Sequence, residues 1–161
     1  MIRKGKQLRE LSLGTYALMD WVHSQTEMAF PGQTELFPSA ILFALKECQW
    51  RGIEDDARLE NLAICLEELL SNAFIHGNRK DKDRLIRVRM KFDSEKLLLS
   101  VRDEGEGFDG KNYLEKIREE QPSIPEKRGL FVVDLLMDEV RFNKKGNEAT
   151  VILYREAGTQ K

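Results

Sequence analysis

The sequence predicts an α+β fold, a two-layer sandwich in which helices cover one face of a mixed, mostly antiparallel sheet. The segments 86–92 and 97–101 alternate apolar and polar residues, which is the period of a strand with one buried face. The segment 59–78 instead repeats apolar residues at steps of three and four, as a helix packed on a core does. Short connections between neighbouring strands favour antiparallel pairing, so the helices are expected to gather on one face.

The composition is that of an ordinary globular protein. The chain has 161 residues, of which 41% are hydrophobic and 34% charged, with a formal net charge of −2. This length fits one domain with a substantial core, and the balanced charge gives no sign of nucleic-acid binding. No apolar run approaches the ~18 residues of a membrane span. Cys48 and Cys65 lack a metal-binding spacing, which fits a reducing compartment. We therefore expect a cytoplasmic protein without nucleic-acid or membrane partners.

The chain is expected to divide into three parts of unequal size. Residues 1–35 form an N-terminal extension of uncertain role, 36–156 form the main domain, and 157–161 form a tail. Within the extension, the segment 15–28 predicts a helix, which Pro31 and the following glycine end.

The main domain opens with two helices. Pro38 can begin the first, because its missing N–H costs nothing in the first turn, and Gly52 stops it. The acidic run 54–56 favours the positive N-terminal end of the long helix, and Gly77 ends that helix. The further expected elements are a turn at 93–96 between the two strands, a short helix at 113–117, an apolar helix at 130–137, and a hairpin formed by 140–142 and 149–154.

Three polar residues follow one edge of the long helix. Glu68, Asn72 and His76 are spaced four residues apart, which stacks them in one row. A carboxylate, an amide and an imidazole then face the same space, and such a row can hold a metal ion and a water. The alternative is that Glu68 and Asn72 are solvated residues at the helix edge and that His76 belongs to a C-terminal cap.

A second polar motif, D-E-G-E-G at 103–107, follows the strand that ends near residue 102. Its glycines let the backbone approach a ligand closely, and Asp103 can accept a hydrogen bond from an exocyclic amine. A calcium loop would need oxygen ligands at the third and fifth positions, which here are Gly105 and Gly107. Calcium is therefore disfavoured, whereas a plain glycine turn remains an alternative.

Three motifs occur in an order that resembles one family. They are E-L-L-S-N-A-F-I-H-G at 68–77, D-E-G-E-G-F-D at 103–109 and R-G-L-F at 128–131, followed by L-M-D-E-V at 136–140 and a hairpin that contains Thr150. This order resembles the GHKL (histidine kinase-like) ATPase superfamily and looks most like its branch of anti-sigma-factor serine/threonine kinases. The resemblance covers about residues 36–155 and implies the histidine kinase-like ATPase fold, with ATP and Mg²⁺ as ligands.

The resemblance implies a role for each motif residue. Glu68 would be the catalytic general base, and Asn72 would give its amide oxygen to a Mg²⁺ that bridges the ATP phosphates. Asp103 would read the adenine amino group, and the stretch 110–127 would be a lid. Nucleotide binding is further assigned to Gly105 and Gly107, which let the loop close over the base, to Arg128, Gly129 and Leu130, whose backbone would hold phosphate at a helix start, and to Thr150, which would support Asp103.

One position departs from the branch. Lys127 stands two residues before Gly129, where members of the branch usually have a glycine. A side chain there would stiffen the hinge of the lid or bring a compensating charge to phosphate.

By this resemblance the chain is an ATP-dependent protein serine/threonine kinase of the anti-sigma-factor type. It would phosphorylate a STAS-domain anti-anti-sigma partner and, in another state, hold a sigma factor, and a homodimer is possible. Two alternatives stay open. One is a binding module of the same fold with little or no kinase activity. The other is a histidine-kinase-type catalytic domain acting in trans, which is weakened because His23 lies in a short, poorly defined segment.

Overall fold

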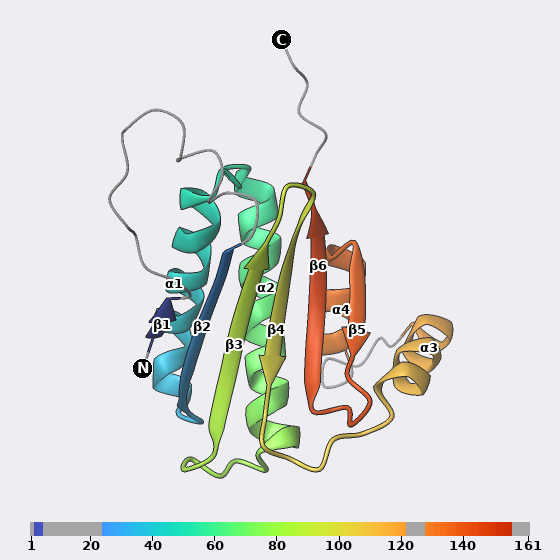
Figure 1. Ribbon diagram of the computed structural model, residues 1–161. Coiled ribbons are helices and arrows are strands. Elements are labelled where there is room, and N and C mark those ends of the chain that lie inside the picture. Colours follow the sequence, from blue (N-terminus) through green and yellow to red (C-terminus); the bar gives the residue numbers. More distant parts are fainter. Residues whose placement is uncertain (1, 5–23, 122–127, 156–161) are drawn as a thin grey trace, which may run out of the picture.

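The computed structural model describes residues 2–4, 24–121 and 128–155. Over these residues it contains one six-stranded sheet in the order β1-β2-β3-β4-β6-β5, in which all neighbouring strands are antiparallel. Helices α1, α2 and α4 lie together behind the sheet (Figure 1), so the predicted two-layer α+β fold is confirmed. The elements are β1 (Ile2–Lys4), β2 (Ser24–Pro31), η1 (Thr34–Leu36), α1 (Phe37–Trp50), α2 (Asp56–Asn72), η2 (Ala73–Gly77), β3 (Leu85–Phe92), β4 (Lys96–Arg102), α3 (Gly110–Glu120), α4 (Gly129–Leu136), β5 (Glu139–Phe142) and β6 (Glu148–Tyr154).

The long helix α2 forms as its sequence predicts. The Asp55 side chain caps it by accepting a hydrogen bond from the Arg58 N–H at 2.8 Å. Its apolar stripe is buried against the sheet and comprises Leu59, Leu62, Cys65, Leu66, Leu69 and Leu70. After Asn72 the chain widens into the π-helical turn η2, which the bond from the Asn78 N–H to the Ala73 carbonyl closes at 2.7 Å. The wider turn interrupts the α-helical stacking between Asn72 and His76.

The predicted strands at 86–92 and 97–101 are confirmed as β3 and β4, and in both strands buried side chains alternate with side chains that are at least partly exposed. Asp93 closes the turn between them, since its side chain accepts hydrogen bonds from the N–H groups of Glu95 and Lys96, both at 2.8 Å. The later helix and hairpin are also found, as α4 and the β5–β6 pair. The inner face of the sheet therefore follows directly from the sequence pattern.

The predicted helix at 15–28 is wrong over residues 24–28, while 15–23 lie outside the described residues. Residues 24–28 belong to β2, which pairs with β3 from Ser24 opposite Phe92 to Pro31 opposite Leu85. Apolar residues are too few here to distinguish a period of two from one of 3.6, and the exposed backbone of β3 supplies a pairing partner. The sheet thus includes part of the segment that was set apart as an extension.

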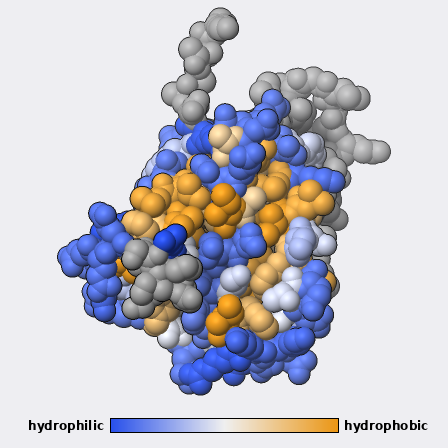
Figure 2. Space-filling model, turned by 180° about the vertical axis from the view of Figure 1, so that it is seen from behind, coloured by the Kyte–Doolittle hydropathy of each residue, from blue (hydrophilic) through white to orange (hydrophobic). Residues whose placement is uncertain are grey.

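Both cysteines are free and fully buried in the helix layer. Burial raises the pKa of the Cys48 and Cys65 thiols to about 12, so both remain protonated at neutral pH. The outer surface of the same layer is partly apolar (Figure 2). Its helices α1, α2 and α4 each have an exposed large apolar residue, namely Leu42, Ile64 and Leu135. None of the described helices is long and apolar enough to cross a membrane.

Candidate functional site

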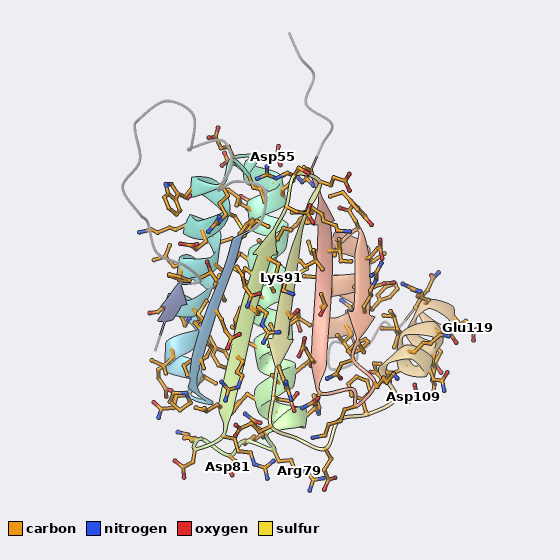
Figure 3. The ribbon with its side chains drawn as sticks, viewed as in Figure 1. Asp55, Arg79, Asp81, Lys91, Asp109 and Glu119 are labelled. Atoms are coloured by element: carbon orange, nitrogen blue, oxygen red, sulfur yellow. The ribbon has the colours of Figure 1, made fainter. Side chains whose placement is uncertain are left out.

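A cleft of about 390 Å³ opens where α2 and η2 meet the loops that follow β4 and precede β6. It lies toward the end of the sheet marked by Arg79 and Asp81, opposite the end marked by Asp55 (Figure 3). The predicted site residues that line it are Asn72, Asp103, Gly107, Gly129 and Leu130. The other lining residues are Leu69, Ala73, His76, Gly77, Val101, Phe108, Tyr113, Phe142, Gly146, Asn147, Glu148 and Ala149.

Asp103 forms a half-buried acceptor at one end of this cleft. Its Oδ1 accepts a hydrogen bond from the Gly105 N–H at 2.7 Å. Burial raises the pKa of the Asp103 carboxyl, although the Gly105 bond opposes that shift. The carboxylate lies directly against the Gly77 backbone, where a Cβ would overlap it. Only glycine therefore leaves room for Asp103 beside the helix end.

The glycine loop itself packs backbone to backbone against the turn before β6. Gly107 has φ +80°, and a Cβ there would overlap the Lys145 carbonyl oxygen. Gly146 has φ +77° and lies equally close to the Phe108 backbone. Both positions require glycine for conformation and for space.

We expect Gly107→Ala to destabilise the fold by about 3 kcal/mol, because a left-handed alanine is strained and its methyl group meets fixed backbone atoms. The melting temperature should fall by roughly 6–12 °C, measured by differential scanning fluorimetry. Gly129→Ala is the matched control. Its Cβ would lie 2.5 Å from Glu68 Oε2, the end of a side chain that can move aside. Equal losses for the two variants would contradict a backbone origin for the Gly107 effect.

The side chains of Glu68 and Asn72 lie next to Gly129, the first residue of α4. A Cβ at Gly129 would lie 2.5 Å from Glu68 Oε2 and 3.6 Å from Asn72 Nδ2, so both side chains border this glycine. Burial, and then the neighbouring Glu67 carboxylate, raise the pKa of the Glu68 carboxyl. Glu68 does not line the cleft itself but lies at its margin, one turn before Asn72.

The amide nitrogen of Asn72 is a buried polar atom that stands out among the described residues. This atom, Nδ2, has no hydrogen bond to any of the described residues. Because buried polar groups normally have partners, an unpaired amide in a cleft marks a place for a ligand. Rotation of the Asn72 side-chain amide by about 180° exchanges its nitrogen and oxygen. The amide oxygen then occupies the position of Nδ2, and oxygen is the ligand that a hard cation requires.

Besides Glu68, three predicted residues lie outside the cleft lining. Gly105 is buried behind Asp103, where a Cβ would lie 2.8 Å from Asp103 Oδ1. Arg128 precedes α4 with an exposed side chain. The Thr150 hydroxyl instead pairs with the Ser100 hydroxyl at 2.8 Å across β4 and β6. Neighbouring strand residues face opposite sides, so Ala149 lines the cleft and Thr150 points to the open face of the sheet.

An aromatic wall on the α3 side of the cleft was not predicted. The Phe108 ring lies 5.7 Å from the Tyr113 ring and 5.3 Å from the Phe142 ring, both in edge-to-face arrangements. All three rings line the cleft. Of the predicted lid at 110–127, the structure describes α3, whereas Lys127 lies outside the described residues.

Residues 30–153 match the family of the histidine kinase-like ATPase domain, and the chain belongs to this family. The resemblance to GHKL ATPases is thereby confirmed, and the family implies that the chain binds ATP. The chain is similar to the serine-protein kinase RsbW of Bacillus subtilis, with 29% identity over 121 residues that cover 71% of this chain and 75% of the relative. RsbW of Oceanobacillus iheyensis is 28% identical over 97 residues, or 54% of this chain and 59% of the relative.

Proposed function

We propose that the chain is an ATP-dependent protein serine/threonine kinase of the anti-sigma-factor type. The observation that carries this proposal is the arrangement of Glu68 and Asn72 around Gly129, because Asn72 and Gly129 line the same cleft as the acceptor Asp103 and Glu68 lies at its margin. ATP-dependent phosphoryl transfer needs a group that recognises the base, and a carboxylate and an amide near the phosphates. Asp103 would supply the first, and Glu68 and Asn72 would supply the other two.

The residues divide the chemistry between them. Asp103 accepts a hydrogen bond from the adenine amino group and so places the base. The acceptor serine oxygen bonds to the γ-phosphorus while the bond from that phosphorus to the β–γ bridging oxygen breaks, and ADP leaves. Glu68 takes the proton of the serine hydroxyl, which its raised pKa favours, because a base works best when its pKa approaches the operating pH.

The donor set around Asn72 fits a magnesium ion. The described residues contain no group of three or more His, Cys, Asp or Glu side chains that could hold a metal by themselves. Mg²⁺ keeps several waters and takes one or two protein ligands together with substrate phosphates. The Asn72 amide oxygen would hold it, and Mg²⁺ would neutralise the charge of the phosphates.

The relatives support a serine as the acceptor, since both are named serine-protein kinases. We place that serine on a STAS-domain anti-anti-sigma protein and extend the proposal to a sigma factor held in another state. Transfer of labelled phosphate to a STAS protein tests this part. Acid-stable phosphoserine supports the proposal, whereas acid-labile phosphohistidine indicates a histidine-kinase-type domain.

The nucleotide site is tested first by thermal stability with ATP and Mg²⁺. At ~100 times its dissociation constant, ATP should add about 2.7 kcal/mol, which raises the melting temperature of the native chain by roughly 5–11 °C. In Asn72→Ala the magnesium-dependent part of this shift should vanish. The ligand-free variant should lose little stability, because Asn72 Nδ2 has no hydrogen bond among the described residues to lose.

Asn61→Ala is the matched control, because Asn61 lies on the same helix about 16 Å from Asn72. It should keep the full response to ATP and Mg²⁺. A native chain that ATP fails to stabilise would overturn the kinase proposal, and an undiminished magnesium response in Asn72→Ala would remove Asn72 from the site.

A further inference from the structure

The loop after β4 is held by hydrogen bonds at three successive backbone N–H groups. The Asp103 N–H donates to the Asn147 carbonyl at 3.0 Å, the Glu104 N–H to Asn78 Oδ1 at 2.9 Å, and the Gly105 N–H to Asp103 Oδ1 at 2.7 Å. These donors are therefore already used within the protein. What the loop offers a ligand is the second carboxylate oxygen of Asp103, which receives no hydrogen bond from any other described residue.

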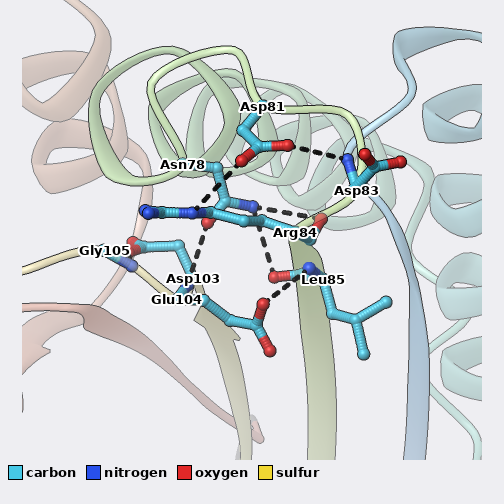
Figure 4. A network of polar contacts seen from close by, with 8 residues as sticks. All are labelled: Asn78, Asp81, Asp83, Arg84, Leu85, Asp103, Glu104 and Gly105. Atoms are coloured by element: carbon cyan, nitrogen blue, oxygen red, sulfur yellow. Dashed lines mark hydrogen bonds and ion pairs between the residues drawn. The ribbon is translucent and has the colours of Figure 1, made fainter.

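Asn78 supports this loop from the helix side, and its side chain is fully buried. Besides accepting from Glu104, it donates through Nδ2 to the carbonyls of Arg84 at 3.4 Å and Leu85 at 3.3 Å (Figure 4). Its own N–H closes the π-helical turn at Ala73. One residue thus ties together the end of the helix, the start of β3 and the loop, through its backbone N–H and its side chain.

Asn147 supports the loop from the opposite side and is 3% exposed. Its Nδ2 donates to the Asp103 carbonyl at 2.9 Å, so Asp103 is held through both its N–H and its C=O. Asn143 in turn fixes Asn147, since Asn143 Oδ1 accepts from the Asn147 N–H at 3.1 Å and Asn143 Nδ2 donates to Asn147 Oδ1 at 2.9 Å. The Asn147 side chain is therefore held in one orientation by Asn143.

We propose that Asn78 and Asn147 are positioning residues for nucleobase selection. They hold the backbone of 103–105 in one conformation, and that conformation aims the free oxygen of Asp103 at an amino group on the base. An acceptor that is ordered before binding discriminates best, because no entropy is lost in ordering it and a mismatched donor–acceptor pattern is not relieved by loop movement. This inference rests on the proposed ATP site and adds to it a source of adenine selectivity.

The test compares ATP and GTP affinities by isothermal titration calorimetry in the native chain and in Asn78→Ala. We expect ATP binding to weaken about 10-fold, equivalent to ~1.4 kcal/mol, with GTP affinity nearly unchanged. The ATP/GTP preference should therefore fall about 10-fold. General destabilisation alone leaves this ratio unchanged when titrations are run well below the melting temperature. Asn147→Ala should lower the ratio as well, and it tests the same claim if Asn78→Ala fails to fold.

Thr26→Val is the matched control for the loss of a buried hydrogen bond. Thr26 is 3% exposed and donates to Glu47 Oε2 at 2.9 Å, between β2 and α1 and away from the cleft lining. It should lower the melting temperature without changing the ATP/GTP ratio. If the asparagine variants lose stability but keep the native ratio, the two residues are structural only and the inference is overturned. A native chain that binds neither nucleotide overturns the proposed function itself.

Discussion

Replacing Glu68 with glutamine is expected to lower kcat for phosphoryl transfer at least ~100-fold while ATP affinity stays within about threefold. Glutamine keeps the size of the side chain beside Gly129 but cannot accept the serine proton. Steady-state kinetics with the acceptor protein measure kcat, and calorimetry measures ATP binding. Glu67→Gln is the matched control, because Glu67 is the exposed neighbour on the same helix. A Glu68→Gln enzyme with native kcat would exclude Glu68 as the base.

The raised pKa of Glu68 gives the same prediction a dependence on pH. Activity should rise with pH along an acid limb that lies above the ordinary glutamate pKa of 4.5. For stability the sign is opposite. A carboxyl whose pKa is raised in the folded state contributes stability that is fully present below the unfolded pKa and is lost as the pH rises through the folded pKa. Above that pH, Glu68→Gln should be at least as stable as the native chain.

Asp103→Asn is expected to weaken ATP binding by roughly 10- to 100-fold, since a hydrogen bond to a charged group contributes about 1.5–3 kcal/mol. The Gly105 N–H holds one oxygen of this side chain, so an asparagine would keep its oxygen there and turn its NH₂ toward the cleft. A donor would then face the adenine amino group, which is also a donor. Calorimetric titration with ATP measures the change.

Thr150→Val serves as the control for Asp103→Asn, because the Thr150 hydroxyl pairs with Ser100 on the face opposite the cleft. It should bind ATP with native affinity. Burial raises the pKa of the Asp103 carboxyl above the ordinary aspartate value of 3.8. As the pH falls through this raised pKa, the carboxylate becomes protonated, and ATP binding by the native chain should weaken. Unchanged affinity in Asp103→Asn would remove this carboxylate from base recognition.

The sequence is most informative where one strong period or one residue type decides the structure. The leucine stripe of α2 and the alternation of β3 and β4 each fix a buried face, so the sandwich follows from pattern alone. The residue type alone singles out Gly107, because glycine is the residue that most readily adopts a positive φ in close contact with another backbone segment. The cleft then brings five predicted residues together, from Asn72 to Leu130.

Other features depend on partners that are distant in the chain. Thr150 and Ala149 differ by one position, and a shift of one residue in a strand exchanges its two faces, so motif order alone could not choose between them. Asn78 and Asn147 look like ordinary turn residues in the sequence. Their importance comes from bonds to Glu104 and Asp103, 26 and 44 positions away. Such bonds are visible only when the chain has folded.

The placement of the cleft beside the end of β4 and the start of β6 has a consequence for how this architecture can diversify. The two strands are direct neighbours in the sheet, and the chain between them leaves at Asp103 and returns at Asn147, which hydrogen-bond to each other. The excursion that carries α3 and α4 therefore begins and ends at one point. Doubling the length of a flexible loop costs only ~0.6 kcal/mol in chain entropy. Insertions in the excursion can thus alter what approaches the nucleotide while the strand register, and the acceptor fixed at its base, remain the same.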